Sequence, residues 1–285
     1  MSFQLFTPLF QKIDQVTTTF VTEICANTIL AITPVVSIGL TLAFMAYGLL
    51  VLQGSIEMPV HNFIARSFRI AVIVSLALTG GLYQAQIAQL VMHGSDELAY
   101  ALVPGSPQTE SPASLLDHAA GNGFDKASQA FEKAGHFEAQ EIVYGLFGIT
   151  LLLATGIMTA LGGAYMVLIK LVLALLAGLG PLFIVALLWQ STSRFFAAWI
   201  KQILSYALLL VFLSALLGLI VSLYSNYMTD LQFDGVQNVS YGLGGAVILA
   251  VLSIIIFQQL PALARALANG VSLAWVWKLQ TNRRS

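Results

Sequence analysis

The side chains that could bind a metal ion or act as a nucleophile are few in this chain and lie far apart. The only cysteine, Cys25, can form no disulfide within the chain, and we expect it to be a packing residue rather than a functional thiol. The histidines form neither a helical pair nor a cluster with ligand spacing, which favours surface or interface positions; they are His61, His93, His118 and His136. A glycine-rich phosphate loop with a lysine is also missing. The sequence therefore predicts no metal, no cofactor and no catalytic constellation.

One charged residue, Lys170, stands in the long apolar stretch 142–190. A charge within a membrane is costly and usually functional, which would place Lys170 facing a pore. Five spans instead favour a position at the inner membrane interface, where the aliphatic stem lets the ammonium group reach water, and the pore is the alternative. We assign Lys170 and Lys201 to a pore or an interface, and we interpret Arg194 and Lys201 as cytoplasmic anchors rather than ligands.

A block rich in glycine, proline and aromatic residues follows Lys170. Gly178, Gly180 and Pro181 predict a break in the helix, because proline lacks the amide that a helix interior needs. The basic and aromatic members of the block follow a short apolar run: Arg194, Phe195, Phe196 and Trp199. Such a cluster is typical of an interfacial belt, with a subunit contact or a gate as the alternative.

Small residues recur every four positions in several apolar segments. Gly156, Ala160 and Ala164 form one such row, and Gly178 continues a second one that begins at Ala174. Small residues at this spacing let helix backbones approach closely in lipid. We expect these rows to mark helix packing, either within the chain or between subunits.

Composition identifies the environment in which these residues must be positioned. The 285 residues are 58% hydrophobic and only 9% charged, whereas soluble domains are about 25% charged. This composition predicts an integral membrane protein. Long apolar runs without alternation exclude a barrel, so the fold class is all-α, a polytopic helical membrane protein.

The apolar runs predict five membrane spans and five regions. The spans are 28–52, 68–92, 143–169, 202–224 and 239–260. The first three regions are an amphipathic helix at 1–27, spans one and two within 28–92, and a hydrophilic segment at 93–141. The fourth region, 142–260, contains the remaining spans and a non-crossing segment near 171–192. The fifth region is a helix and tail at 261–285. Within the hydrophilic segment we expect short helices at 114–120 and 125–134, and after Pro261 a new helix at 262–278.

Basic clusters orient the chain through the positive-inside rule. With Arg66 and Arg69 inside, the amino terminus and the segment 93–141, which has eight acidic and two basic residues, lie outside. A basic carboxy terminus that is also inside requires an odd number of spans. Five spans place every basic cluster inside, so we expect 143–169 to cross and 171–192 to be re-entrant or broken.

The block Gly180–Trp199 resembles the signature of a known family. It reads Gly-Pro-Leu-Phe from Gly180, then an apolar run, then the pair Phe195 and Phe196, and finally Trp199. This pattern resembles the TrbL-like polytopic inner-membrane subunit of type IV secretion and conjugation machines. The predicted layout of spans and segments is similar to that family over most of the chain.

The resemblance implies a function that is not enzymatic. A member would lie in the inner membrane of a Gram-negative bacterium as a homo-oligomer at the base of the pilus or stalk, with other secretion subunits as partners. It would support pilus assembly and the transfer of DNA or effector protein, with the segment 93–141 contributing to transfer and 262–278 to assembly. Membrane lipid and transient contacts with the transferred substrate complete the expected partners. The alternative function is a secondary transporter of a small solute, for which the break at Gly178–Pro181 would supply the binding site.

Overall fold

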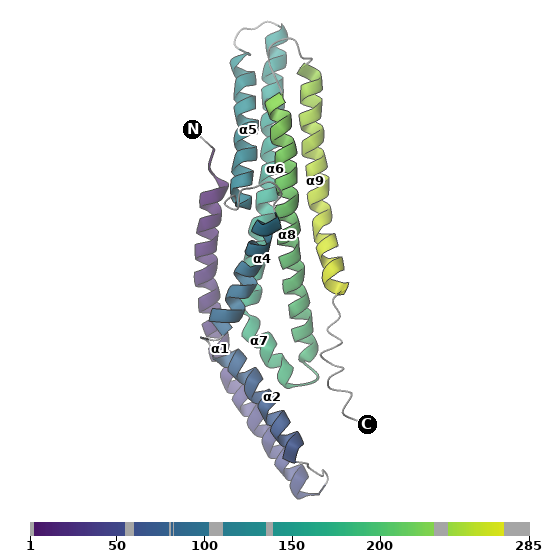
Figure 1. Cartoon of the computed structure of the whole chain (residues 1–285). Helices are drawn as coiled ribbons and strands as arrows, with labels where there is room; N and C mark the ends of the chain where they lie inside the picture. The colour runs from purple at the N-terminus through teal and green to yellow at the C-terminus, as the bar shows by residue number, and fades with distance from the viewer. Residues whose placement is uncertain are drawn as a thin grey trace. The chain divides into compact units, whose positions relative to one another are not determined.

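The computed structural model describes residues 3–54, 60–79, 81, 83–102, 111–134, 139–230 and 239–270. The regular structure in these ranges is helical throughout, which confirms the all-α fold class (Figure 1). The tail 271–285, parts of the segment 93–141 and the last part of the predicted helix 262–278 lie outside the described residues.

The chain divides into two compact units. Unit 1 comprises 1–15, 95–170 and 205–268, and unit 2 comprises 16–94, 171–204 and 269–285. Several long helices contribute residues to both units, so a helix is not confined to one of them.

Unit 1 is a helical core in which four helices meet. They are α5 (Pro112–Glu132), α6 (Ala139–Gly178), α8 (Ser193–Asp230) and α9 (Val239–Gly270). Gly162 on α6 lies at their centre. A Cβ atom there would lie 3.2 Å from Leu116 on α5 and from Leu217 on α8, and 3.7 Å from Phe257 on α9. The missing side chain therefore lets three neighbouring helices approach α6 closely.

The amino-terminal end of α1 (Phe6–Leu52) also belongs to unit 1 and is capped by a distant side chain. The carboxylate of Asp117 accepts hydrogen bonds from the backbone amides of Leu5, Phe6 and Thr7 at 2.8–2.9 Å, and from the Thr7 hydroxyl at 2.7 Å. First-turn amides have no partner within their own helix, so Asp117 supplies the missing acceptors. Burial raises the pKa of Asp117, but these hydrogen bonds outweigh it and lower the pKa below its ordinary value.

Unit 2 gathers the shorter elements. They are α2 (Val60–Leu78), the π-helical turn η1 (Tyr83–Ala88), the start of α4 (Gln89–Leu102), α7 (Gly180–Val185) and the 3₁₀ turn η2 (Ala186–Leu188). α2 packs on α7 and contacts η2. The ring of Tyr47 on α1 stacks on Phe63 of α2 at 6.2 Å between centroids, and the Arg66 guanidinium lies 5.5 Å from the Tyr47 ring.

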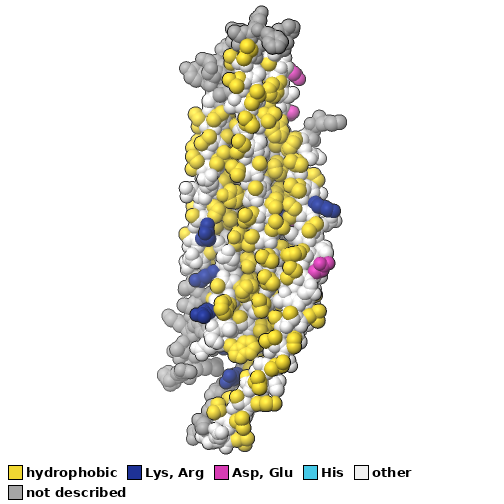
Figure 2. All heavy atoms as spheres, turned by 180° about the vertical axis from the view of Figure 1, so that it is seen from behind, with side chains coloured by type: hydrophobic (Ala, Val, Ile, Leu, Met, Phe, Trp, Pro, Cys, Tyr) yellow, Lys and Arg dark blue, Asp and Glu magenta, His cyan; other side chains and the backbone are white. Residues whose placement is uncertain are grey.

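Four described helices are long and apolar enough to cross a membrane. The bent pair Phe63–Leu78 and Tyr83–Leu98, which turns by 70°, gives a fifth span when it is counted as one. The stretch 142–190 contains a single candidate span, Ile142–Gly178, and the next begins at Ser193. The predicted five spans equal the upper count. Figure 2 shows hydrophobic side chains spread over the face with few charged side chains among them, as expected for a multi-pass membrane protein.

Several element boundaries differ from the sequence-based expectation. α1 runs without interruption through residue 27, and α9 continues through Pro261, because one proline removes a single hydrogen bond and need not end a helix. The predicted span 68–92 is interrupted after Leu78. The two short helices expected at 114–120 and 125–134 are wrong, since α5 is one helix. Gly123 serves close packing there, because a Cβ atom would overlap the side chain of Thr155.

Replacing Asp117 by asparagine should weaken the docking of α1 by about 1–3 kcal/mol, because buried amides lose a charged acceptor. We expect a lower thermal midpoint of the purified protein in detergent and faster hydrogen exchange at Leu5–Thr7. Since the pKa of Asp117 is lowered in the folded state, its stabilisation is complete above about pH 4 and is lost as pH falls through the folded value.

The matched control is Asp125→Asn, because Asp125 lies on the same helix and is exposed. This control should leave the midpoint and the exchange rates unchanged. Equal midpoints for both variants, or an acid response that Asp117→Asn does not reduce, would contradict the capping role.

Candidate functional site

The end of α6 at Gly178 is the local feature from which the site is built. Carbonyl groups in the last turn of a helix have no partner within that helix. Two side chains from other segments donate to them: the Tyr83 hydroxyl to the Ala177 carbonyl at 2.5 Å, and the Trp199 indole N–H to the Leu176 carbonyl at 3.0 Å. Both side chains are buried, with Tyr83 0% and Trp199 4% exposed. These two protein donors cap the carboxyl end of α6.

Gly180 is the residue that makes this capping arrangement fit. A Cβ atom at Gly180 would overlap the Tyr83 hydroxyl and lie 3.0 Å from the Trp199 ring. Pro181, also buried, occupies the first turn of α7, where its missing amide costs no hydrogen bond. The helix therefore ends and restarts around a fixed pair of aromatic donors.

The aromatic residues of the block divide into a stacked group, in which Trp199 is buried and Phe183 and Phe196 are half-buried, and the exposed Phe195. Phe183 stacks on Trp199 with ring centroids 5.8 Å apart, and Phe196 lies 5.6 Å from the same ring. Phe195 is 51% exposed, and the Arg194 guanidinium lies 5.5 Å from its ring centroid. The structure thus brings Phe183, Phe196 and Trp199 together and leaves Phe195 and Arg194 at the surface.

Hydroxyl groups close the turn between η2 and α8. The Thr192 hydroxyl donates to the Ala186 carbonyl at 2.7 Å, and the Ser193 hydroxyl donates to the Gln190 carbonyl at 2.7 Å. These bonds satisfy carbonyls that neither helix can pair, so the chain can reverse here while remaining close to apolar surroundings.

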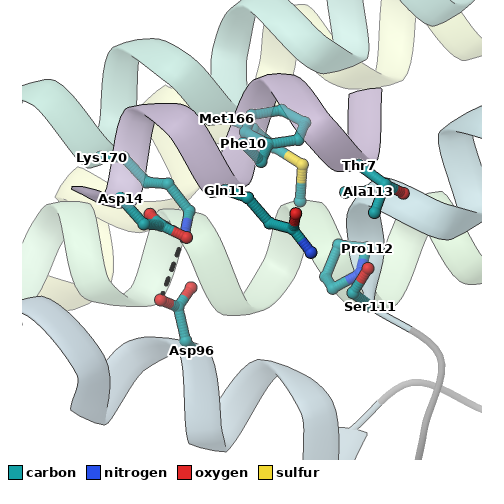
Figure 3. Close-up of a pocket in the computed structure, with 10 residues that line it drawn as sticks. All are labelled: Thr7, Phe10, Gln11, Asp14, Asp96, Ser111, Pro112, Ala113, Met166 and Lys170. Atoms are coloured by element: carbon teal, nitrogen blue, oxygen red, sulfur yellow. Dashed lines mark hydrogen bonds and ion pairs between the residues drawn. The ribbon is translucent and has the colours of Figure 1, made fainter. Parts of the chain in front are cut away.

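Lys170, in unit 1, forms an ion cluster with two carboxylates. Its ammonium group lies 2.7 Å from a carboxylate oxygen of Asp14 on α1 and 3.3 Å from one of Asp96 on α4. Figure 3 shows Asp14 beside Lys170, with Asp96 reaching toward them from a separate helix. The Lys170 side chain is 16% exposed, against 44% for Asp14 and 24% for Asp96. Two carboxylates therefore compensate one half-buried cation.

A pocket of about 130 Å³ adjoins this ion triad, Lys170, Asp14 and Asp96. Its remaining lining comes from α1, α5 and α6 and from the residue before α5: Thr7, Phe10, Gln11, Ser111, Pro112, Ala113 and Met166 (Figure 3). The charge of Lys170 is neutralised within the chain, and its position at a pore or at the membrane interface stays a prediction.

The row of small residues lies away from the helix contacts. Ala160 and Ala164 are exposed, and nothing lies within 4 Å of a Cβ atom built at Gly156. Gly178 differs, because a Cβ atom there would lie 3.0 Å from the Ile24 side chain and 3.8 Å from the Val21 backbone of α1. Of the two alternatives for the row Gly156–Ala164, packing between subunits stays a prediction.

Lys201 is half-buried on α8 and lies near Arg194 along an open hollow. Within the described ranges, no group of three or more His, Cys, Asp or Glu side chains is placed to hold a metal ion. The side chains of His61 and His136 lie outside the described residues, while His93 and His118 are exposed.

Sequence reasoning missed the partners of its own candidates. Tyr83, Asp14 and Asp96 contact residues 74–156 positions away, and no local pattern relates them. One signal was available for the ion triad, since Lys170 is a charge within a strongly apolar stretch.

Comparison with known proteins gives a family match across most of the chain. A family model described as TrbL/VirB6 plasmid conjugal transfer protein matches residues 40–260. This range includes the break after α6, the turn before α8 and Trp199.

Individual relatives carry the same description. The chain is 29% identical over 219 residues to the type IV secretion system protein VirB6 of Brucella abortus biovar 1 (strain 9-941), an alignment covering 75% of this chain and 63% of the relative. It is 25% identical over 230 residues to the protein of that name from Bartonella quintana (strain Toulouse), covering 79% and 67%. The chain thus aligns with less than two thirds of the length of the Brucella relative.

Replacing Gly180 by alanine should displace the Tyr83 hydroxyl from the Ala177 carbonyl, because the new Cβ atom would overlap it. We expect a loss of about 1–3 kcal/mol, the usual cost of a buried carbonyl without a donor. Thermal unfolding in detergent measures it. Gly156→Ala is the control, as its Cβ atom meets open space; it should be neutral or slightly stabilising. Equal losses of thermal stability in both variants would contradict the role of Gly180 in the contact between Tyr83 and the Ala177 carbonyl.

Replacing Lys170 by methionine should destabilise unit 1 by about 1–3 kcal/mol, less than for a fully buried pair because both carboxylates are partly exposed. The double variant Lys170→Met/Asp96→Asn should recover part of this loss, since it removes one uncompensated charge. Lys12→Met, on the exposed side of α1, is the control. The ion triad does not stabilise the fold if Lys170→Met and the control Lys12→Met have the same thermal midpoint. The same conclusion follows if Asp96→Asn restores none of the stability lost in Lys170→Met.

Proposed function

The chain belongs to the TrbL/VirB6 family of plasmid conjugal transfer proteins, and from this premise we propose that it is an inner-membrane channel or scaffold subunit of a type IV secretion system. The family match over residues 40–260 is the observation that carries the proposal. In this role the chain catalyses no chemical reaction and is not an enzyme. It positions helices through which, or along which, a DNA–protein or protein substrate passes, and it supports pilus or stalk assembly.

The distribution of charge along the sequence supports an orientation with the amino terminus outside and the carboxy terminus inside. The segment 93–141 contains eight Asp and Glu residues against two Lys residues, whereas basic residues flank the apolar runs at other positions. Basic residues accumulate on the cytoplasmic side of inner-membrane proteins. Arg66, Arg69, Arg194 and Lys201 then lie toward the cytoplasm and the acidic segment 93–141 toward the periplasm.

Exposed apolar and small side chains support assembly as a homo-oligomer. Along α1, Leu30, Ile38 and Leu42 are between 61% and 72% exposed. On α6, Ala160 and Ala164 are exposed beside Gly156. A second copy could pack closely against such a small-residue row, while lipid covers the remaining apolar surface.

The carbonyls at the break after α6 already accept hydrogen bonds from side chains of the protein. This arrangement argues against the alternative function, a secondary transporter. In transporters of the broken-helix type, the freed carbonyls and amides face the substrate or coupling ion. Here the carbonyls of Leu176 and Ala177 accept hydrogen bonds from Trp199 and Tyr83. The break is therefore better suited to fixing the shape of a scaffold than to binding a solute.

Deleting the gene should abolish conjugation or effector delivery by the host while solute uptake stays normal. A copy carrying Trp199→Phe, which keeps an aromatic ring but loses the indole N–H, should restore delivery poorly because the Leu176 carbonyl loses its donor. Delivery is counted as transconjugants or translocated reporter, at membrane levels of the protein matched by immunoblotting.

The matched copy carries Gly244→Ala, whose Cβ atom meets open space, and should restore delivery fully. Undiminished delivery without the gene would refute the secretion role. Full complementation by Trp199→Phe would separate the capping of α6 from that role.

A further inference from the structure

An open hollow of about 490 Å³ lies beside the first two turns of α8. Its lining residues are Gln190, Ser193, Arg194, Ala197, Ala198 and Lys201. Arg194 and Lys201 are seven residues apart, so they share one face of the helix with about 10 Å between them along the axis. The two lining residues between them on this helix are alanines, Ala197 and Ala198, which leave the space open. The hollow is therefore a shallow cavity with a cation at each end.

The two cations have no anionic partner among the residues that the structure describes. Among these residues, the Arg194 guanidinium contacts the ring of Phe195, and Lys201 takes part in no ion pair. The first turn of α8 also contains no acidic residue. Lys170 differs from both, because two carboxylate oxygens lie within 3.3 Å of its ammonium group and neutralise it. The hollow thus keeps two positive charges available to an external anion.

The position of the hollow along the chain indicates its depth. After Lys201 the helix continues through an apolar run without charge until Asp230, as part of the candidate span Ser193–Asp230. Basic residues at one end of an apolar span lie at the level of lipid headgroups, where anionic lipids attract them. Beside them, Phe195 exposes 51% of its surface and could contact acyl chains.

We propose that this hollow binds the headgroup phosphate of an anionic phospholipid. Arg194 presents a planar guanidinium that can hold two phosphate oxygens at once, and Lys201 adds a point charge farther along the helix. The side chain of Gln190 is exposed at the rim and offers an amide donor. The acyl chains then follow the apolar surface of α8.

A nucleic-acid strand fits the hollow less well. Sustained binding to such a strand draws on many phosphate contacts and on aromatic rings that stack with bases. The hollow supplies two cations, and the neighbouring Trp199 is 4% exposed and already stacked on Phe183. Only Phe195 remains for a base, which favours a lipid over a strand.

The test titrates the full chain in uncharged detergent with phosphatidylglycerol or phosphatidylcholine of equal chain length, and native mass spectrometry measures the bound fraction. Phosphatidylglycerol should bind more tightly to the unaltered protein. Each variant Arg194→Gln and Lys201→Gln should weaken it about five-fold, and the double variant about 25-fold, as expected for two basic residues near an anionic surface. Arg194→Lys, which keeps the charge, should weaken it less than Arg194→Gln.

The matched control is Lys12→Gln/Lys133→Gln, which removes the same charge elsewhere and should leave lipid binding unchanged. The proposal is overturned if the double variant binds phosphatidylglycerol as the unaltered protein does, or if the control weakens binding equally. Two further arms use inorganic phosphate and a single-stranded oligonucleotide. Displacement of the lipid by millimolar inorganic phosphate would assign the hollow to a free anion. Oligonucleotide binding that alone depends on Arg194 and Lys201 would assign it to a nucleic acid.

Discussion

The pairing of backbone carbonyls at the end of α6 is the constraint on which the rest of unit 2 depends. A buried carbonyl without a donor is costly, so a helix that ends inside the protein needs donors from other segments. Tyr83 and Trp199 provide them from two segments that are otherwise remote in sequence. Their positions in turn require a glycine at 180 and favour the stack with Phe183. Trp199, which the sequence alone places in an interfacial aromatic belt, thus also donates a hydrogen bond that caps α6.

Charge is handled in two contrasting ways along the chain. In unit 1 the cation of Lys170 is matched by Asp14 and Asp96, so that a charge in an apolar helix is tolerated at moderate burial. In unit 2 the described cations Arg194 and Lys201 stay open to the surroundings. The first arrangement holds helices together, and the second makes a surface to which something else can bind.

Composition and periodicity were sufficient for the fold class, and the glycines and proline near 180 were sufficient to locate the break. Both follow from local physics: helices are required in lipid, and proline lacks an amide. Helix ends were less predictable, because Pro261 and the glycines of α5 interrupt nothing when tertiary packing accommodates them. The contacts of Tyr83, Asp96 and Asp117 could not be read from one sequence, since each depends on how distant segments fold together. The family followed from the block near Trp199, whose resemblance to TrbL-like proteins the match over residues 40–260 confirms.

The cap on α1 has a consequence for the order in which the protein is made. Asp117 lies 110–112 residues after the amides that it accepts from. At ribosomal rates of 5–20 residues per second, synthesis of the chain between these amides and Asp117 takes roughly 5–20 seconds. Insertion of α1 into the membrane cannot draw on this cap, so the first helix must enter on its apolar character alone. Docking of its amino-terminal turn is then a late step of biogenesis, completed only after α5 has emerged from the ribosome.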